Sequence, residues 1–284
     1  DTSLIFANWH DDPSDPQNYY FEQTDDYLLN TIAQGTDIVY RLGVSIEHSI
    51  KKYAAVAPED YAKFAEICAG VIRHYNKGWA DGYHLNIKYW EVWNEPDCVP
   101  NMWEKSMNDY YEMYAVVAKR LKSEFPEIRI GGLVTTHLNQ EYIMSFLGKC
   151  ITENAPVDFI SWHKYGAVVQ DFVAEPFRAR ALLDAFGFRQ TELHLNEWHY
   201  LPCSWSAIRS TSESRRYWLT ASEGMQGIDS GVFNTTVLTR WQDTPLDLSN
   251  YYATGLLTWG LRDVYGGLNK NYYSFLAFGK MLSC

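Results

Sequence analysis

Residues 89–97 read Tyr-Trp-Glu-Val-Trp-Asn-Glu-Pro-Asp, and this stretch says more about the fold than any other part of the sequence. Its first half is rich in aromatic and β-branched residues, which favour a buried β-strand. Pro96 has no N–H to donate to a neighbouring strand, so the strand ends before it. Glu95 is therefore left at the carboxyl end of a strand. In α/β barrels and in open α/β sheets, that end is where ligands bind and chemistry occurs.

Short β-rich segments alternate with longer amphipathic segments along the rest of the chain, which is typical of βα units with parallel strands. We predict strands near 38–43, 88–93, 128–133, 157–163, 192–197 and 232–240, with a possible further strand at 4–7. We predict helices at about 60–76, 107–124, 139–153, 175–187, 212–229 and 272–282. The length of 284 residues is close to that of one (β/α)8 barrel, roughly 250 residues, so we expect a single domain over 1–284.

The Asn-Glu-Pro ending resembles the acid/base strand of the clan A glycoside hydrolases, and the longer form resembles family 39, which holds β-xylosidases and α-L-iduronidases. The resemblance covers most of 38–282 and implies an α/β fold of the (β/α)8 TIM-barrel type. It makes the strand at 88–93 the fourth of the barrel and the strand at 38–43 the third. We therefore expect a barrel that lacks its first one or two strands in this chain, without the C-terminal β-sandwich domain of many members. An exposed barrel edge at 38–43 would invite self-association.

A second strand also ends in a carboxylate. Residues 191–198 read Thr-Glu-Leu-His-Leu-Asn-Glu-Trp and leave Glu197 at the strand end. A retaining glycosidase needs two carboxyl groups about 5–5.5 Å apart. Glu197 lies on the third predicted strand after the Asn-Glu-Pro strand, where the clan resemblance implies the nucleophile. We predict Glu95 as the acid/base and Glu197 as the nucleophile, with no metal or organic cofactor.

Two other glutamates compete for these roles. Glu91 lies earlier in its strand, so we expect a core carboxylate that a structural hydrogen bond satisfies. Glu192 opens its strand at the opposite, stability-related face of the predicted barrel. Neither lies at the functional rim.

The family resemblance also implies substrate contacts. Asn94 would hydrogen-bond the 2-hydroxyl of the sugar. The predicted strand 157–163 runs on into Lys164 and Tyr165 and is similar to the sixth strand of the clan. There a tyrosine hydroxyl orients the nucleophile and a histidine helps to define the sugar pocket, which implies these roles for Tyr165 and His163. Side-chain alternation leaves open whether Lys164 faces the site or the packing.

Three further residues are candidates for the substrate pocket. Glu47 and His48 follow the predicted strand at 38–43, where they would reach sugar hydroxyls or form an ordinary ion pair at the rim. Trp241 follows the predicted strand at 232–240, where it would floor a sugar subsite or pack in the core.

The composition excludes several other classes of protein. A formal net charge of −11 argues against nucleic-acid binding, which needs a basic surface. No apolar run approaches the roughly 18–20 residues of a membrane span. Aromatic residues make up 16% of the chain, and their flat apolar faces suit sugar stacking as well as core packing. The five cysteines are widely spaced and indicate free thiols. Cellular location stays undetermined.

These observations favour a retaining exo-acting glycoside hydrolase with a glycoside or oligosaccharide substrate, of which a β-xyloside is the first expectation. Two alternatives stay open. One is a carbohydrate-binding barrel without turnover, and the other is an endo-acting clan A glycanase with an open groove.

Overall fold

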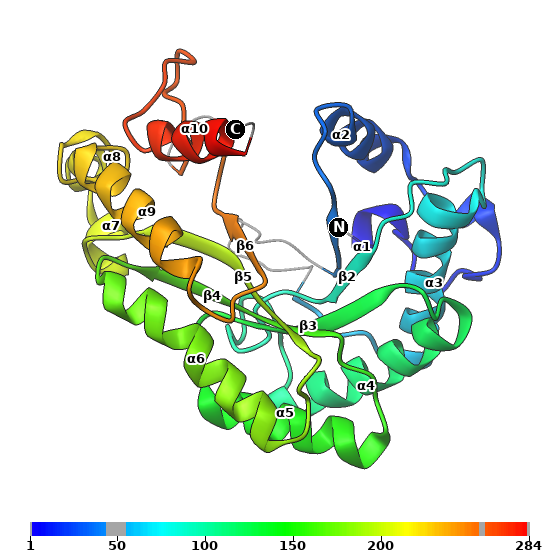
Figure 1. Cartoon of the computed structure of the whole chain (residues 1–284). Helices are drawn as coiled ribbons and strands as arrows, with labels where there is room; N and C mark the ends of the chain where they lie inside the picture. The colour runs from blue at the N-terminus through cyan, green and yellow to red at the C-terminus, as the bar shows by residue number, and fades with distance from the viewer. Residues whose placement is uncertain (1, 44–54, 256–258, 283–284) are drawn as a thin grey trace. The chain divides into compact units, whose positions relative to one another are not determined.

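The computed structural model describes residues 2–43, 55–255 and 259–282 (Figure 1). The strands are β1 (Val39–Leu42), β2 (Tyr89–Val92), β3 (Arg129–Thr135), β4 (Phe159–Gly166), β5 (Glu192–Tyr200) and β6 (Leu248–Tyr251). The helices are α1 (Thr2–Ile5), the 3-10 turn η1 (Pro16–Asn18), α2 (Glu22–Ile32), α3 (Tyr61–Lys77), α4 (Met107–Glu124), α5 (Gln140–Glu153), α6 (Val169–Ala185), α7 (Trp205–Ser210), α8 (Ser212–Thr220), α9 (Ile228–Trp241) and α10 (Tyr272–Met281). None of the helices in these ranges is long and apolar enough to cross a membrane.

The six strands are neighbours in chain order, from β1 to β6. β1 pairs with β2, β2 with β3, and β5 with β6, each in parallel. The chain divides into two compact units, residues 1–161 with 183–192, and residues 162–182 with 193–284. The expectation of one domain over 1–284 stays a prediction, as does self-association through the edge that β1 forms in this strand order.

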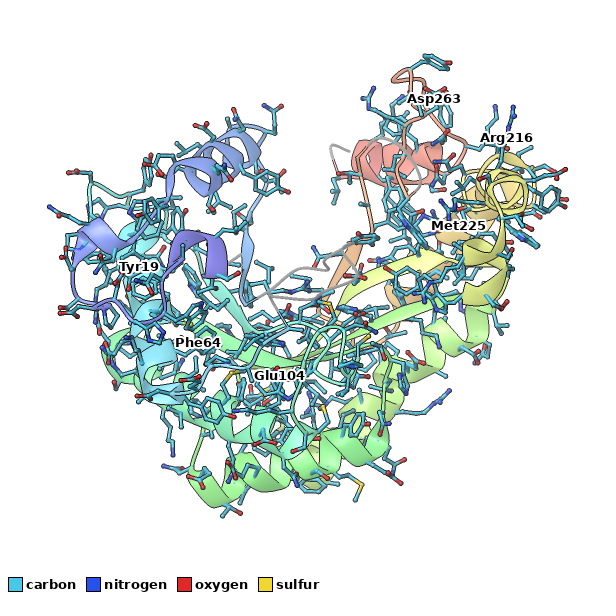
Figure 2. All side chains as sticks on the ribbon, turned by 180° about the vertical axis from the view of Figure 1, so that it is seen from behind. Tyr19, Phe64, Glu104, Arg216, Met225 and Asp263 are labelled. Atoms are coloured by element: carbon cyan, nitrogen blue, oxygen red, sulfur yellow. The ribbon has the colours of Figure 1, made fainter. Side chains whose placement is uncertain are left out.

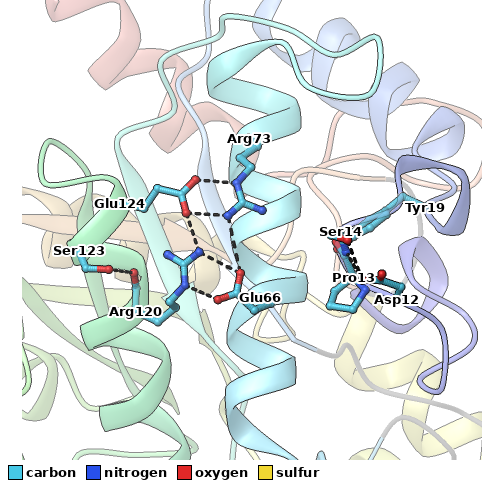
Figure 3. Close-up of polar contacts among 9 residues, drawn as sticks. All are labelled: Asp12, Pro13, Ser14, Tyr19, Glu66, Arg73, Arg120, Ser123 and Glu124. Atoms are coloured by element: carbon cyan, nitrogen blue, oxygen red, sulfur yellow. Dashed lines mark hydrogen bonds and ion pairs between the residues drawn. The ribbon is translucent and has the colours of Figure 1, made fainter.

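The first unit packs helices α3, α4 and α5 against the strands β1 to β3 (Figure 1). Helix α3 begins where the Asp60 side chain accepts hydrogen bonds from two backbone N–H groups, and it ends at Gly78 in the left-handed region. Across the surface of α3 and α4, Arg73 pairs with Glu124 at 2.6 Å, and Arg120 pairs with both Glu66 and Glu124 (Figure 3). This network of two cations and two anions links the helices more firmly than an isolated surface pair would.

Aromatic side chains fill the interior of the first unit. Phe64 on α3 is fully buried, and Tyr19, which follows η1, packs beside the same helix (Figure 2). Gly70 makes this approach possible, because a Cβ at that position would lie 2.5 Å from the Tyr19 hydroxyl. The Tyr19 hydroxyl donates to the Pro13 carbonyl at 2.8 Å, which closes the loop between these two residues beside α3 (Figure 3).

The second unit has a core of its own. Met225, at the turn between α8 and α9, is completely buried with Leu201 and Ile208 (Figure 2). A second group of aromatic rings surrounds Trp198 of β5, whose ring centroid lies 6.3 Å from that of Phe172 on α6.

The structure corrects the predicted strand at 232–240, because this segment belongs to helix α9. Its valines and threonines suggested a strand. The buried residues of α9, however, recur at helical spacing, and they are Ser230, Gly231, Phe233, Asn234, Val237 and Trp241. The helix also satisfies the threonine hydroxyls, since Thr235 donates to the Gly231 carbonyl and Thr239 to the Thr235 carbonyl. The strand after α9 is β6, which the sequence analysis did not predict.

Two smaller predictions also differ from the structure. Residues 4–7 do not form a strand, because α1 occupies Thr2–Ile5 as a single helical turn. The predicted helix at 212–229 is interrupted after Thr220. At Gly224 a Cβ would lie 2.3 Å from the Trp218 carbonyl oxygen, so the chain turns there with a closeness that only glycine allows.

Candidate active site

The Asn-Glu-Pro segment leaves β2 with an unusual backbone. Trp93 has a φ of 71° and Glu95 a φ of 45°, both in the left-handed region that non-glycine residues seldom occupy. Each such residue costs about 1–3 kcal/mol, and residues of this kind cluster at functional sites. The Glu95 N–H donates to the Val134 carbonyl at 3.0 Å, which fixes the backbone of the glutamate to β3. The strained backbone at the end of β2 is therefore held in a defined place by its hydrogen bond to β3.

Asp97 fastens the same segment from its other side. Its buried carboxylate accepts the Thr136 N–H at 2.9 Å and the Thr136 hydroxyl at 2.6 Å. The Cys98 N–H donates to the Glu95 carbonyl at 2.9 Å, which closes a tight turn over Pro96. The last residue of the Asn-Glu-Pro-Asp sequence thus ties the glutamate's loop to the residue that follows β3.

Asn94 lies beside the glutamate and is buried, with a relative exposure of 6%. Its side-chain oxygen has no hydrogen-bond partner among the described residues. A buried amide oxygen without a partner is costly unless something supplies a donor. A sugar hydroxyl is a donor of the required kind.

Glu91 behaves as the sequence predicted. It is buried, it pairs with Arg41 at 2.9 Å, and it accepts the Ser161 hydroxyl at 2.6 Å. Arg41 and Glu91 are partners in the parallel register of β1 and β2. The competing glutamate is therefore a satisfied core carboxylate. Glu192, at the start of β5, pairs with Arg129 at the start of β3 at 2.9 Å and lies at the end of its strand opposite Glu197, also as predicted.

The second unit surrounds Glu197 with polar and aromatic side chains. Glu197 lies on β5, and the Tyr165 hydroxyl, from the end of β4, donates to its Oε1 at 2.6 Å. A hydroxyl that donates to a carboxylate forms a charge-assisted hydrogen bond, stronger than a neutral one. The Nδ1 of the buried His163 lies 3.6 Å from the same oxygen. This tyrosine and this histidine are the two residues that the resemblance implied for β4.

Lys164 lies between these two residues and faces the other way. Its ammonium group pairs with Glu175 of α6 at 2.6 Å and lies 5.4 Å from the centre of the Phe172 ring. Successive side chains of a strand point to opposite faces, so this contact settles the question that the sequence left open. Lys164 belongs to the packing between β4 and α6.

The ligand types at Glu197 also bear on metal binding. A histidine nitrogen and a carboxylate oxygen are both accepted by zinc. The Glu197 oxygen nearest to His163 already accepts the Tyr165 hydroxyl, however. This contact shows that the carboxylate is oriented, and because metal-ligating carboxylates are also hydrogen-bonded, it does not decide between a metal ligand and a nucleophile.

An aromatic cluster that the sequence analysis missed lies beside Tyr165. The ring centroid of Tyr165 is 5.0 Å from that of Trp205 and 5.7 Å from that of Trp259. Trp259 also contacts Tyr252, which follows β6, at 6.1 Å. Only the general excess of aromatic residues pointed toward this cluster, because these residues lie outside the strands that the sequence predicted.

His199 extends the polar chain along β5. Its Nδ1 lies 2.7 Å from the Tyr200 carbonyl, which accepts only, so Nδ1 carries the proton. Its Nε2 lies 2.7 Å from the Tyr251 hydroxyl, which therefore donates to it. Burial lowers the pKa of His199 to about 4 and raises the pKa of Tyr251 to about 12. Both side chains are therefore neutral between these two values.

We expect His199 to make the protein less stable in mild acid. The ordinary pKa of 6.5 applies to the unfolded chain and about 4 to the folded one, so between these values the unfolded state binds a proton that the folded state refuses. The free energy of unfolding should fall as the pH drops below 6.5, by on the order of 3 kcal/mol in total. Above pH 6.5 the protonation of His199 should not change the free energy of unfolding. Urea unfolding of wild type and His199→Gln at pH 7.5 and 5.0 measures this, and an equal drop in both proteins would contradict it.

Of the three remaining predicted substrate residues, the structure describes only Trp241. Trp241 is the last residue of α9, not the end of a strand, and the sugar-subsite prediction for it is wrong. Its indole N–H donates to the Phe172 carbonyl at 2.9 Å, and its ring packs on Trp198 at 4.9 Å, so it is a core residue. Glu47 and His48 lie outside the described residues.

A cavity of about 420 Å³ lies in the first unit next to the end of β2. Its walls include Trp9, Phe64 and Trp93, and the charged groups of Glu59 and Lys63 also line it. The rings of Trp9 and Phe64 are stacked with centroids 5.8 Å apart. Flat apolar faces beside a few charged groups are typical of pockets that hold small polar molecules.

Comparison with known proteins places these features in one family. The sequence profile of glycosyl hydrolases family 39 matches residues 29–186, which is more than half of the chain and includes Glu95. A β-xylosidase of Geobacillus stearothermophilus is 29% identical over 196 residues, which are 61% of this chain and 38% of that protein. The family match ends before β5, so it does not reach Glu197.

Solved structures extend the likeness over nearly the whole chain. A glucosidase from Croceicoccus marinus matches with a TM-score of 0.80 and 25% identity, over 97% of this chain and 56% of that chain. A monomeric β-xylosidase from Caulobacter crescentus CB15 matches with a TM-score of 0.71 and 18% identity, over 92% of this chain and 56% of that chain. The chain thus spans about half the length of these solved proteins and less of the β-xylosidase from Geobacillus. The likeness confirms the predicted α/β fold of the (β/α)8-barrel type, with six strands in the described residues.

Proposed function

Because the chain belongs to glycosyl hydrolase family 39, we propose that it is a retaining, exo-acting glycoside hydrolase that cleaves β-xylosides through a covalent glycosyl-enzyme. The observation that carries this proposal is the hydrogen bond from Tyr165 to Glu197. A nucleophilic carboxylate has to be ionised and aimed at one carbon atom, and a hydroxyl donor beside it serves both needs. The relation to β-xylosidases supports the choice of sugar.

The proposed reaction has two steps. In the first, an oxygen of Glu197 attacks the anomeric carbon, the bond from that carbon to the leaving oxygen breaks, and Glu95 gives its proton to that oxygen. In the second, water attacks the same carbon, Glu95 takes the water's proton, and the ester bond to Glu197 breaks. For this sequence we expect the two carboxyl groups to stand about 5–5.5 Å apart, the spacing of retaining enzymes.

Residues beside each of the two carboxylates supply the proposed substrate contacts. Asn94 would accept a hydrogen bond from the 2-hydroxyl through its buried side-chain oxygen, which no described residue contacts as a donor. The rings of Trp205 and Trp259 beside Tyr165 would stack on the sugar or on the leaving group.

A second candidate substrate is a glucoside, because a glucosidase has a TM-score of 0.80 to this chain. A glucoside carries one hydroxymethyl group more than a xyloside. A pocket built for xylose would exclude it by contact, whereas a roomier pocket would accept both.

A panel of 4-nitrophenyl glycosides tests the proposal, with β-xyloside, β-glucoside and α-L-arabinofuranoside as substrates. We expect the β-xyloside to have the highest kcat/KM, and proton NMR to show β-xylose as the first product because two inversions restore the configuration. First release of the α anomer would mean inversion and would refute the retaining mechanism. No turnover, with xylose still bound in a calorimetric titration, would favour the carbohydrate-binding barrel.

A further inference from the structure

The hydroxyl of Tyr110 lies between two strands of the sheet. Tyr110 is a fully buried residue in the first turn of α4. Its hydroxyl donates to the Val92 carbonyl of β2 at 3.0 Å and accepts the Leu133 N–H of β3 at 2.9 Å. A side chain from the helix layer therefore bridges a backbone acceptor on one strand and a backbone donor on the next.

The strand pairing changes at this bridge. Up to it, β2 and β3 pair regularly, from Tyr89 opposite Arg129 to Glu91 opposite Gly131. Beyond it the backbone of both strands enters the left-handed region, at Trp93 and Glu95 after β2 and at Leu133 and Val134 in β3. The next bond between the two segments is the one from the Glu95 N–H to the Val134 carbonyl. The hydroxyl thus lies where the regular pairing of β2 and β3 ends and the segment that carries Glu95 begins.

The surroundings leave room for this hydroxyl and hold it in place. Gly132 lies against it, and a Cβ on that residue would come within 2.7 Å of the hydroxyl oxygen. The start of α4 is fixed by a capping box of Ser106 and Asp109. Burial raises the pKa of Tyr110 well above its usual value, so the hydroxyl keeps the proton that it donates to Val92.

We propose that Tyr110 is a positioning residue for Glu95, holding the ends of β2 and β3 in the conformation that presents this carboxyl group as proton donor. The proposal rests on the proposed acid/base role of Glu95. Without the hydroxyl, the Val92 carbonyl and the Leu133 N–H would each lose a buried partner, and the strands would have to shift to satisfy them. A shift of about 1 Å at the proton donor is enough to cost on the order of 100-fold in rate.

The variant Tyr110→Phe tests the proposal, since it removes the hydroxyl and keeps the ring. We expect amide hydrogen exchange measured by NMR to become at least about tenfold faster at Leu133 and at Glu95, because both N–H groups depend on the bridge. We expect kcat/KM to fall about 10- to 100-fold for methyl β-xyloside, whose leaving group needs a proton. For dinitrophenyl β-xyloside, whose leaving group needs none, we expect a change of less than about threefold.

Tyr114→Phe is the matched control. Tyr114 lies one turn further along α4, is equally buried, and donates its hydroxyl to the Pro156 carbonyl at 2.9 Å, away from β2. We expect it to lose some stability and to leave both the Glu95 exchange rate and the ratio of the two kcat/KM values unchanged. Unchanged exchange at Glu95 in Tyr110→Phe, or an equal fall for both substrates, would overturn the positioning role. If the wild type hydrolyses no glycoside, the proposed function fails, while the exchange rates still decide whether Tyr110 anchors Glu95.

Discussion

Glu197→Ala is expected to abolish turnover of every glycoside that the wild type hydrolyses, with a fall in kcat of roughly 10⁴- to 10⁶-fold. Without the carboxylate no covalent intermediate forms, whatever the leaving group. Added azide should restore turnover of an activated aryl β-xyloside, because the small anion can attack the anomeric carbon from the vacant face. A single displacement inverts the configuration, so the product should be the α-glycosyl azide, which NMR identifies.

Glu192→Ala is the control for this experiment. Glu192 lies on the same strand, β5, at the opposite end, where it pairs with Arg129. This variant should keep nearly wild-type kcat and should form no glycosyl azide. A β-configured azide from Glu197→Ala would mean that another residue still forms the covalent intermediate, and Glu197 would lose its assignment as nucleophile.

The position of Glu197 in the fold was predictable because strand and polar ending coincide in one short stretch. Residues 192–197 are apolar at alternate positions and end in a carboxylate, and β5 covers them as Glu192–Tyr200. β2 was likewise predictable from its own residues, and so was the burial of Glu91 within it. Local sequence located both strands and their carboxylates. It did not predict the end of β5, which runs three residues past Glu197 to Tyr200, with a register shift between Leu195 and Trp198.

The last part of the barrel could not be predicted in this way. The segment 232–240 has the composition of a strand. Whether it forms a strand or a helix depends on which of its side chains the rest of the second unit buries. That information lies in distant residues, such as Phe172, which accepts the indole N–H of Trp241. Because a strand was predicted at 232–240, Trp241 was expected at a strand end in the site. For the same reason no strand was predicted at β6, which follows α9.

The sequence also gave no sign of Tyr110 or of the cluster at Trp205 and Trp259. Tyr110 belongs to an amphipathic helix in which a buried tyrosine is ordinary, and its hydroxyl matters only because the ends of β2 and β3 need a partner. Contacts of this kind arise from tertiary packing alone. They can be inferred once the backbone is known and not before.

Glu95→Ala is expected to separate the substrates by their leaving groups. An alkyl xyloside leaves only with a proton, so its kcat/KM should fall by roughly 10²- to 10⁴-fold. A dinitrophenyl xyloside leaves without one, and its kcat/KM should stay within about tenfold of the wild type. Hydrolysis of the glycosyl-enzyme also needs Glu95 as base, so kcat for the activated substrate should drop and the intermediate should accumulate, which mass spectrometry of the intact protein detects.

Azide again reports the stereochemistry, and its expected outcome differs from that in the first experiment. In Glu95→Ala the nucleophile Glu197 is still present, so azide attacks the glycosyl-enzyme and gives the β-glycosyl azide after two inversions. Glu112→Ala, an exposed glutamate of α4 that lies 3.6 Å from Lys149, should behave as wild type toward both substrates. An inverted azide product from Glu95→Ala, together with a retained one from Glu197→Ala, would exchange the two assignments. Equal losses for alkyl and dinitrophenyl substrates would instead show that Glu95 supplies no proton, because only a proton donor distinguishes leaving groups by their acidity.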